Sequence, residues 1–248
     1  MRLNGKSAIV TGGASGFGAG IVRRFILEGA RVVIADINGE AAAELANELG
    51  EAALGLKVDV ADADDVAQLV QSTVKFAGGV DILVNNAGVG HTPQPMEILS
   101  EDDFDRIFEV NIKSIYRTAQ AVVPIMKKNR SGAILNMGST GGVSPRPNLT
   151  WYNASKGWMI TATRSMAIEL AGSGVRVNAL NPVAGETPLL KTFMGEDTPE
   201  VRAKFLASIP IGRFSTPEDM GAAACFLCSD DASMITGVAL EVDGGRCI

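Results

Sequence analysis

Short apolar runs alternate with longer helical patterns along all 248 residues of the chain. The runs are nearly continuous, as in strands that are covered on both faces of a parallel sheet. The alternation therefore predicts an α/β fold, a doubly wound and mostly parallel seven-stranded sheet with helices on both faces. The expected strands are Ala8–Thr11, Arg31–Ala35, Ala53–Val58, Ile82–Asn85, Ala133–Met137, Arg176–Leu180 and Gly237–Val242.

Helical patterns fill the segments between these strands, and no linker interrupts them, so we expect residues 1–248 to form a single domain. One stretch departs from the alternation. Residues 185–212 are expected to form a substrate-loop excursion, in which Lys191–Pro210 could move as a lid. The main expected helices are Gly18–Glu28, Glu40–Leu49, Ala63–Phe76, Asp103–Lys128, Tyr152–Ala171 and Pro217–Cys228.

Charge and composition exclude several classes of protein. The formal net charge of −6 leaves no basic surface for nucleic acid. No apolar stretch approaches the roughly 18 residues of a membrane span, and the amino-terminal segment lacks the features of a signal peptide. Cys225 and Cys228 lie in an apolar helical pattern, where two core thiols are expected, and His91 is the only histidine. We expect a cytoplasmic protein without metal, membrane or nucleic-acid partners.

A glycine-rich turn, Thr11-Gly12-Gly13-Ala14-Ser15-Gly16-Phe17-Gly18, joins the first strand to a helix. Glycines let backbone N–H groups approach a pyrophosphate that a Cβ would keep away. The spacing differs from G-x-G-x-x-G, so the turn alone is weak evidence. Asp36 strengthens it, because it follows the second strand, 20 residues after Gly16, where a carboxylate can accept hydrogen bonds from the adenosine ribose. Together these features predict a dinucleotide site.

Asp36 also bears on which dinucleotide binds. A carboxylate here repels the 2′-phosphate of NADP, and neither Ile37 nor Asn38 supplies a neutralising cation. We therefore expect NAD to be preferred to NADP.

Three further residues have the chemistry of an acid–base site. Ser139 follows the fifth strand, and Tyr152 precedes Lys156 by four residues, which places the phenol and the ammonium on one helix face. A charge about 4 Å away at an effective dielectric near 20 is worth about 4 kcal/mol, enough to bring the pKa of a phenol from about 10 towards 7. Such a tyrosine can exchange a proton with an alcohol or a ketone while the serine holds the substrate oxygen.

The sequence resembles the short-chain dehydrogenase/reductase family over essentially its whole length, with similarity to the 3-oxoacyl-acyl-carrier-protein reductases among its members. The resemblance implies a Rossmann-type fold and a nicotinamide cofactor. It is carried by Thr11-Gly12-x-x-x-Gly16-x-Gly18, Asp59-Val60, Asn85-Asn86-Ala87-Gly88, Asn111, Ser139, Tyr152-Asn153-Ala154-Ser155-Lys156, and Asn181-Pro182 with Thr187.

The resemblance assigns cofactor contacts residue by residue. It implies that Asp59 and Val60 contact the adenine ring, that Asn86-Ala87-Gly88 borders the cofactor, and that Thr187 bonds the carboxamide. The expected cofactor residues are Gly12, Ser15, Gly16, Phe17, Gly18, Asp36, Asp59, Val60, Asn86, Ala87, Gly88, Tyr152, Lys156, Pro182, Val183 and Thr187.

It also completes the expected catalytic set, which is Asn111, Ser139, Tyr152 and Lys156. Asn111 resembles an asparagine that breaks a helix and holds a water in a proton relay. Lys156 is expected both to bind the nicotinamide ribose and to lower the pKa of Tyr152.

The chain departs from the family pattern after Pro182. The family usually has Pro-Gly and then, two residues on, an isoleucine or valine against the nicotinamide, whereas this chain has Pro182-Val183-Ala184-Gly185-Glu186-Thr187. Length is preserved, so we expect the loop to pass the ring still, with Val183 as the side chain that packs there.

The resemblance implies that the substrate pocket is lined by Val89–Pro95, Thr140–Arg146, Leu149–Trp151 and Val183–Met194. These segments supply His91, Arg146, Trp151 and Phe193. For His91, a solvated loop position and a substrate hydrogen bond are equally open. Trp151 is expected to form a pocket wall beside the tyrosine.

Several functions fit this set of residues. We rank first an NAD-dependent oxidoreductase that transfers a hydride to or from a secondary alcohol or ketone of a polyol, sugar or cyclic alcohol. The alternative is a 3-oxoacyl-acyl-carrier-protein reductase, for which Arg130 matches one expected carrier contact and Ser173 replaces the other. A distant alternative is a non-catalytic nucleotide-sensing protein.

The resemblance also implies a homotetramer. One interface would come from the two long helices, which carry more apolar residues than one sheet face covers, including Ile112, Ile115, Met159 and Ile160. The second would come from the last strand and the helix Pro217–Cys228.

Overall fold

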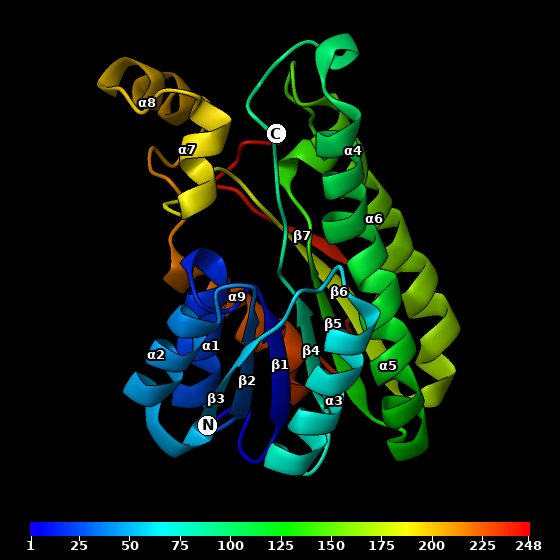
Figure 1. Cartoon of the computed structure of the whole chain (residues 1–248). Coiled ribbons are helices and arrows are strands. Elements are labelled where there is room, and N and C mark those ends of the chain that lie inside the picture. The colour runs from blue at the N-terminus through cyan, green and yellow to red at the C-terminus, as the bar shows by residue number, and fades with distance from the viewer.

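The computed structural model describes residues 1–248 and contains one seven-stranded sheet in which every pair of neighbours is parallel (Figure 1). The strand order is β3-β2-β1-β4-β5-β6-β7, so the α/β, doubly wound prediction is confirmed. The strands are β1 (Ser7–Thr11), β2 (Arg31–Asp36), β3 (Ala53–Lys57), β4 (Ile82–Asn85), β5 (Gly132–Met137), β6 (Val175–Pro182) and β7 (Ala239–Val242).

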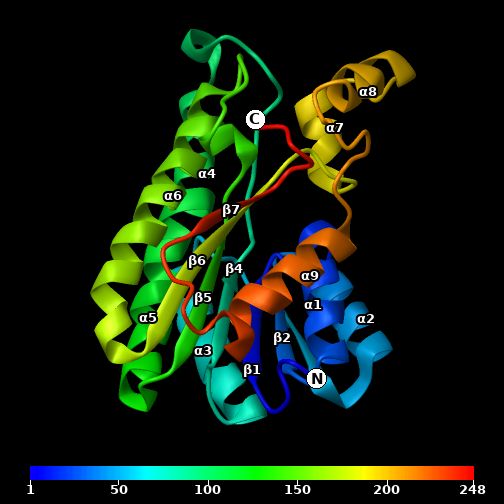
Figure 2. The same ribbon diagram turned by 180° about the vertical axis from the view of Figure 1, so that it is seen from behind.

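Two helical layers cover the sheet, with α1, α2 and α9 on one face and α3, α5 and α6 on the other (Figures 1 and 2). Each layer has its own apolar core, the first around Phe25 and Met220, and the second around Leu69 and Met126. The helices are α1 (Gly16–Leu27), α2 (Gly39–Leu49), α3 (Ala63–Ala77), α4 (Glu101–Phe108), α5 (Ser114–Asn129), α6 (Thr150–Leu170), α7 (Pro188–Met194), α8 (Pro199–Leu206) and α9 (Pro217–Cys228).

The long helix expected at Asp103–Lys128 is not one regular helix. A π-helical turn at Glu109–Lys113 separates α4 from α5. Asn111 lies in this turn, and its fully buried side chain bonds outside its own helix. Periodicity does not predict such a turn, because one extra residue barely disturbs the spacing of the apolar residues.

The stretch at residues 185–212 does leave the strand–helix alternation, but it contains two short helices that we did not expect. Both α7 and α8 begin with a proline at the first helical position. They enclose a small apolar cluster of Val183, Leu190, Met194, Ile209 and Phe214. Figure 1 shows this lobe, in yellow and gold, beyond the carboxyl ends of the strands.

The strand order places a crevice above β1 and β4. The chain leaves β1 towards β2 on one side of the sheet, while β4 and β5 continue on the other. The loops after β1 and β4 therefore diverge, and ligands of such sheets bind at this point.

The structure contains neither a membrane-spanning helix nor a cluster of potential metal ligands. No helix is long and apolar enough to cross a membrane. No group of three or more histidine, cysteine, aspartate or glutamate side chains is placed to hold a metal ion. Cys225 and Cys228 are buried in α9 among core residues, as expected.

The packing of α1 against α9 depends on glycines at the crossing. A Cβ on Gly20 would overlap the carbonyl oxygen of Pro217, which is backbone and cannot turn away. We expect Gly20→Ala to lower the free energy of unfolding by about 1–3 kcal/mol, measured by urea denaturation. Gly157→Ala is the control, because its Cβ would meet only one atom, 3.9 Å away, and should be neutral or stabilising. Equal stability of Gly20→Ala and wild type would contradict this account of the crossing.

Candidate active site

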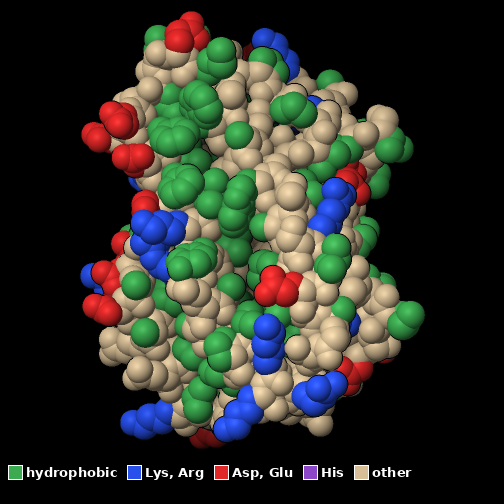
Figure 3. Space-filling model, turned by 90° about the vertical axis from the view of Figure 1, so that its right-hand side faces the viewer, with side chains coloured by type: hydrophobic (Ala, Val, Ile, Leu, Met, Phe, Trp, Pro, Cys, Tyr) green, Lys and Arg blue, Asp and Glu red, His purple; other side chains and the backbone are tan.

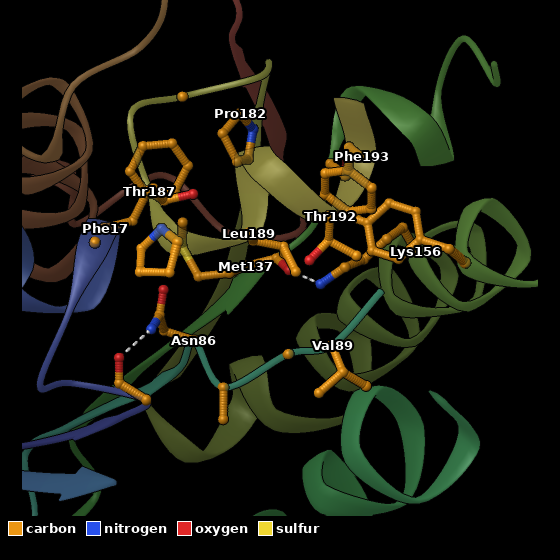
Figure 4. Close-up of a pocket in the computed structure, with 18 of the residues that line it drawn as sticks. Phe17, Asn86, Val89, Met137, Lys156, Pro182, Thr187, Leu189, Thr192 and Phe193 are labelled. Atoms are coloured by element: carbon orange, nitrogen blue, oxygen red, sulfur yellow. Dashed lines mark hydrogen bonds between the residues drawn. The ribbon is translucent and has the colours of Figure 1, made fainter. Parts of the chain in front are cut away.

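One cleft of about 500 Å³ runs along the carboxyl edge of the sheet. Its lining comes from the loops after β1, β2, β3, β4, β5 and β6 and from the α7–α8 lobe, so distant parts of the sequence meet there (Figure 4). Of the expected cofactor residues only Gly18 is outside the lining, and of the expected catalytic residues only Asn111 is.

The glycine-rich turn packs directly against the loop after β4. Gly12 has a φ of +59°, and a Cβ there would lie 2.9 Å from the Cα of Ala87. The Asn86 side chain donates to the carbonyl oxygens of Thr11 (2.9 Å) and Gly12 (2.8 Å). Figure 4 draws one of these two bonds. A Cβ on Gly18 would overlap the Gly12 carbonyl oxygen. These glycines are therefore required by the close approach of backbone segments as well as by any ligand.

Thr11 was not among our expected site residues, yet it joins the two loops. Its hydroxyl accepts hydrogen bonds from the N–H groups of Asn86 and Ala87, both at 3.1 Å. The signal in the sequence was its position as the last residue of β1 before the glycines.

Asp36 ends β2, and its carboxylate faces the glycine-rich turn. One oxygen accepts from the N–H of Ala14 (3.0 Å) and the other from the N–H of Asn38 (3.0 Å). The next side chain, Ile37, is exposed and carries no charge. The end of the cleft at β2 is therefore acidic, without a nearby cation in the loop that follows.

The residues expected at the adenine follow β3. Asp59 and Val60 line the cleft together with Val58. Asp59 accepts a hydrogen bond from the N–H of Ala61 at 2.8 Å, and this bond holds the loop in a tight turn.

Ser139, Tyr152 and Lys156 all line the cleft, Ser139 after β5 and the other two on α6. Tyr152 is buried, which raises the pKa of its phenol to about 12, while a hydrogen bond with Ser139 acts in the opposite direction. Burial lowers the pKa of Lys156 to about 8. The arrangement can deliver a proton from the phenol to an oxygen held in the cleft.

The expectation that Lys156 lowers the pKa of Tyr152 is wrong for this arrangement. The ammonium donates to the carbonyl oxygen of Met137 at 2.8 Å and lies 5.8 Å from the centre of the tyrosine ring. Burial therefore determines the direction of both pKa shifts, upward for the phenol and downward for the ammonium. Spacing along a helix places two residues on one face but does not determine where a flexible lysine bonds.

Asn111 borders the site without lining the cleft. Its side chain accepts from the N–H of Val89 (2.8 Å) and donates to the carbonyl oxygen of Val89 (2.9 Å) and the hydroxyl of Ser155 (3.0 Å). A Cβ on Gly88 would lie 3.5 Å from the Asn111 Oδ1 and 3.4 Å from the Lys156 Nζ. Asn111 thus fixes the loop after β4 beside the lysine.

The loop that departs from the family pattern still borders the cleft. Pro182, Val183 and Thr187 are lining residues, and Val183 is buried in the core of the α7–α8 lobe. Gly185 lies against the ring of Phe17, which a Cβ at position 185 would overlap (Figure 4 shows Phe17 facing Thr187). The close approach of the Phe17 ring therefore accounts for the glycine at position 185, where a larger residue would not fit.

The four residues expected in the substrate pocket divide into two pairs. Phe193 lies 4.8 Å from the Tyr152 ring, centre to centre, and Arg146 also lines the cleft. Trp151 does not line it, because its ring packs edge-on against Phe104 and its Nε1 donates to a carbonyl oxygen outside the cleft.

His91 is buried and also lies outside the lining, so the expectation of a solvated loop position is wrong. Its Nδ1 is 2.9 Å from the carbonyl oxygen of Thr92. The α7 residues Leu189, Leu190 and Thr192 also line the cleft, within the expected pocket segment Val183–Met194, although no motif singles them out.

The glycines that surround the cleft fit a dinucleotide. A Cβ on Gly16 would lie 3.1 Å from the Thr187 side chain. The space between the loop after β1 and the loop after β6 therefore stays open only because residue 16 has no Cβ. The volume and the glycine cradle match what a nicotinamide dinucleotide requires.

Comparison with known proteins gives a consistent picture. Residues 12–246 match the family described as enoyl-(acyl carrier protein) reductase. The chain is 50% identical over 252 residues to the 4-formylbenzenesulfonate dehydrogenase TsaC1/TsaC2 of Comamonas testosteroni, covering 100% of both. It is 40% identical over 256 residues to the 3-oxoacyl-[acyl-carrier-protein] reductase FabG of Thermotoga maritima, again covering 100% of both.

Among solved structures, the chain resembles a 3-ketoacyl-(acyl-carrier-protein) reductase from Brucella melitensis, whose crystal structure is complexed with NADH. The sequence identity is 50% and the TM-score 0.95, with 99% of this chain and 100% of the other covered.

The buried lysine makes the stability of the fold depend on pH. The unfolded chain protonates Lys156 near pH 10.5, and the folded protein only near pH 8, so between these values the unfolded state binds more protons. The free energy of unfolding of wild type relative to Lys156→Met should therefore rise by roughly 1–3 kcal/mol from pH 8 to pH 10.5.

Urea titrations at several pH values measure this difference. Lys127→Met, at an exposed lysine of α5, reports the effect of losing a lysine that is not buried. The free energy of unfolding of wild type relative to Lys156→Met could instead fall or stay level as the pH rises. That result would show that the folded protein does not disfavour the charged lysine.

Proposed function

Because the chain belongs to the short-chain dehydrogenase/reductase family, we propose that it is an NAD-dependent oxidoreductase that transfers a hydride between the cofactor and a secondary alcohol or ketone. The observation that carries the proposal is the meeting of Ser139, Tyr152 and Lys156 in the cleft that also contains the glycine-rich turn. Polyols, sugars and cyclic alcohols are the proposed substrate class.

The residues that would hold the cofactor follow from the lining of the cleft. The backbone of Gly12 and Gly16 would face the pyrophosphate, Asp36 the adenosine ribose, and Lys156 the nicotinamide ribose. When bound, the nicotinamide supplies a hydride acceptor or donor at its C4 atom.

The protein's own part in the reaction is to hold and move a proton. Ser139 donates a hydrogen bond to the substrate oxygen, and Tyr152 gives its phenolic proton to a carbonyl oxygen or takes the proton of an alcohol. A phenol pKa of about 12 keeps Tyr152 protonated near neutral pH, which suits donation to a carbonyl. The oxidative direction requires the phenol to be deprotonated, and the raised pKa of Tyr152 opposes this near neutral pH.

The preference for NAD rests on Asp36. Its carboxylate lies at the ribose end of the cleft, and Ile37 offers nothing to neutralise a 2′-phosphate. The similar structure from Brucella melitensis is complexed with NADH, which supports this choice.

Carrier-protein ketoreduction remains the second candidate, because two of the similar proteins bear that name. Arg130 is exposed at the end of α5, where it could contact a carrier, but Ser173 provides no second cation. Reduction of a 3-oxoacyl thioester would distinguish the two candidates. A cytoplasmic location stays a prediction from the sequence.

We also propose a homotetramer. Ile115, Met159 and Ile160, which we expected to contribute, are buried within the chain itself. Hydrophobic side chains nevertheless gather on this side of the molecule, alongside charged ones, as Figure 3 shows. The large exposed apolar residues of α4, α5 and α6 are Phe104, Phe108, Tyr116, Trp151, Trp158 and Ile168. The edge strand β7, which pairs on one side only, lies beside α9 and suits the second interface.

Light scattering tests the assembly. The expected particle contains four chains of 25.9 kDa, and Ile168→Asp, at a residue that is 83% exposed, should reduce it to smaller species. A particle of one chain would contradict the tetramer.

Tyr152→Phe tests the proton transfer. The ring and its packing against Phe193 are kept, but the only phenolic hydroxyl in the cleft is lost, so kcat should fall about 10²- to 10⁴-fold. The affinity for NAD should change little. Tyr116→Phe, at the other tyrosine of the chain, is the control and should keep full activity. More than about a tenth of the wild-type kcat in Tyr152→Phe would overturn the role given to the phenol.

Asp36→Ala tests the cofactor preference. It should weaken NAD binding and improve the use of NADP, because it removes both the ribose hydrogen bonds and the repulsion of a phosphate. Asp36→Asn separates these effects, since it keeps an oxygen that can accept from Ala14. Initial rates with both cofactors measure the ratio, and a wild type that prefers NADP would contradict the assignment.

A further inference from the structure

Arg146 is the only arginine among the residues that line the cleft. It follows β5 in the loop before α6, and its backbone oxygen accepts a hydrogen bond from the Asn153 side chain at 2.8 Å. Asn153 is the residue after Tyr152, so this bond ties the arginine to the part of the cleft where the phenol lies. The lining carboxylates are Asp36, at the end of β2, and Asp59, after β3. Both strands lie on the opposite side of β1 from β5 in the strand order.

No carboxylate neutralises Arg146. Nine ion pairs join acidic and basic side chains of the chain, and none includes Arg146. Its one side-chain hydrogen bond is from Nη2 to the Ser208 hydroxyl, at 3.0 Å. A neutral hydroxyl satisfies one of the five donors of a guanidinium and does not compensate its charge.

The surroundings of Arg146 increase this electrostatic imbalance. Burial lowers the pKa of Arg146, and the positive charge of Arg246 lowers it further. Arg246 also lacks a carboxylate partner and bonds to the Ser144 hydroxyl at 3.2 Å. A partly buried cation with a second cation nearby is costly unless an anion joins it.

The guanidinium is also held in place before any ligand arrives. Its central carbon lies 4.4 Å from the centre of the Phe205 ring, and the Ser208 bond fixes one end of the group. Both partners come from α8 and the turn that follows it. A planar guanidinium held in this way binds a carboxylate or sulfonate through two parallel hydrogen bonds at a small loss of side-chain entropy.

We propose that Arg146 is a specificity-determining residue that binds an anionic group of the substrate, a carboxylate or a sulfonate, while the reacting oxygen of the same molecule meets Ser139 and Tyr152. This inference rests on the proposed function and narrows its substrates to alcohols or carbonyl compounds that carry a single negative charge away from the reacting carbon. Phe193 and Phe205 line the cleft as well and provide apolar surface for the part between the two ends.

Binding of small anions tests the site without requiring turnover. Benzoate, benzenesulfonate and the neutral benzamide would be titrated into the protein by calorimetry at fixed ionic strength, with and without NAD. Wild type should bind both anions at least about 10-fold more tightly than benzamide, and Arg146→Met should weaken the anions about 10- to 100-fold with little effect on benzamide. Arg146→Lys keeps the positive charge but loses the two parallel N–H donors of the guanidinium. Its affinity for the anions should lie between those of wild type and Arg146→Met.

Arg31→Met is the matched control. Arg31 also lies over a phenylalanine ring, that of Phe76 at 4.2 Å, but it is outside the cleft, so its replacement should leave anion binding unchanged. Equal binding of anions and benzamide by wild type, no measurable binding of either anion, or unchanged anion binding in Arg146→Met would overturn the proposal.

A kinetic comparison separates recognition from structure. With 4-acetylbenzoate and its neutral methyl ester as ketone substrates reduced by NADH, Arg146→Met should raise KM for the anion about 10- to 100-fold with a nearly unchanged kcat and leave the ester unaffected. Equal losses for both would show that Arg146 merely supports the fold. Anion binding that depends on Arg146, without turnover of any alcohol or ketone, would support this site and refute the proposed function. Turnover of neutral alcohols together with anion binding that is insensitive to Arg146 would support the proposed function and refute this site.

Discussion

Parallel pairing of all seven strands places the carboxyl end of every strand on one edge of the sheet, and the whole site depends on this arrangement. The glycine-rich turn after β1, Asp36 at the end of β2 and Ser139 after β5 are far apart in the chain but meet in one cleft. The backbones of these loops lie so close together that a Cβ would overlap a neighbouring backbone atom, and glycines therefore occupy the points of contact. The hydrogen bonds between Thr11 and Asn86 then hold the loop after β1 against the loop after β4.

Much of this arrangement could be predicted from the sequence. The seven apolar runs predicted the strands because parallel strands covered on both faces are mostly apolar, and the glycine spacing with Asp36 located the dinucleotide end. The four-residue step from Tyr152 to Lys156 placed both on one face of α6. These features are local or periodic, so they can be read without knowing which segments touch.

The rest depends on contacts between distant segments. The π-helical turn at Asn111 exists because that side chain bonds to Val89 and Ser155, which no spacing reveals. Trp151 turns to Phe104, and Lys156 turns to the Met137 carbonyl, because those partners are supplied by the fold. Likewise, the α7–α8 lobe closes over its own small core, and this brings Phe205 and Ser208 to Arg146.

The cleft thus combines acidic residues at the ends of β2 and β3, a buried phenol and lysine on α6, and a guanidinium that has no carboxylate partner. The most direct test of the account is to mix the purified protein with NAD or NADP and a panel of secondary alcohols, polyols, hydroxy acids and 3-hydroxyacyl thioesters, and to follow the absorbance of the reduced nicotinamide. The account predicts reduction of NAD, faster than of NADP, by at least one secondary alcohol of the panel. Tight binding of NAD without reduction by any member of the panel would contradict it and would favour a nucleotide-sensing protein instead.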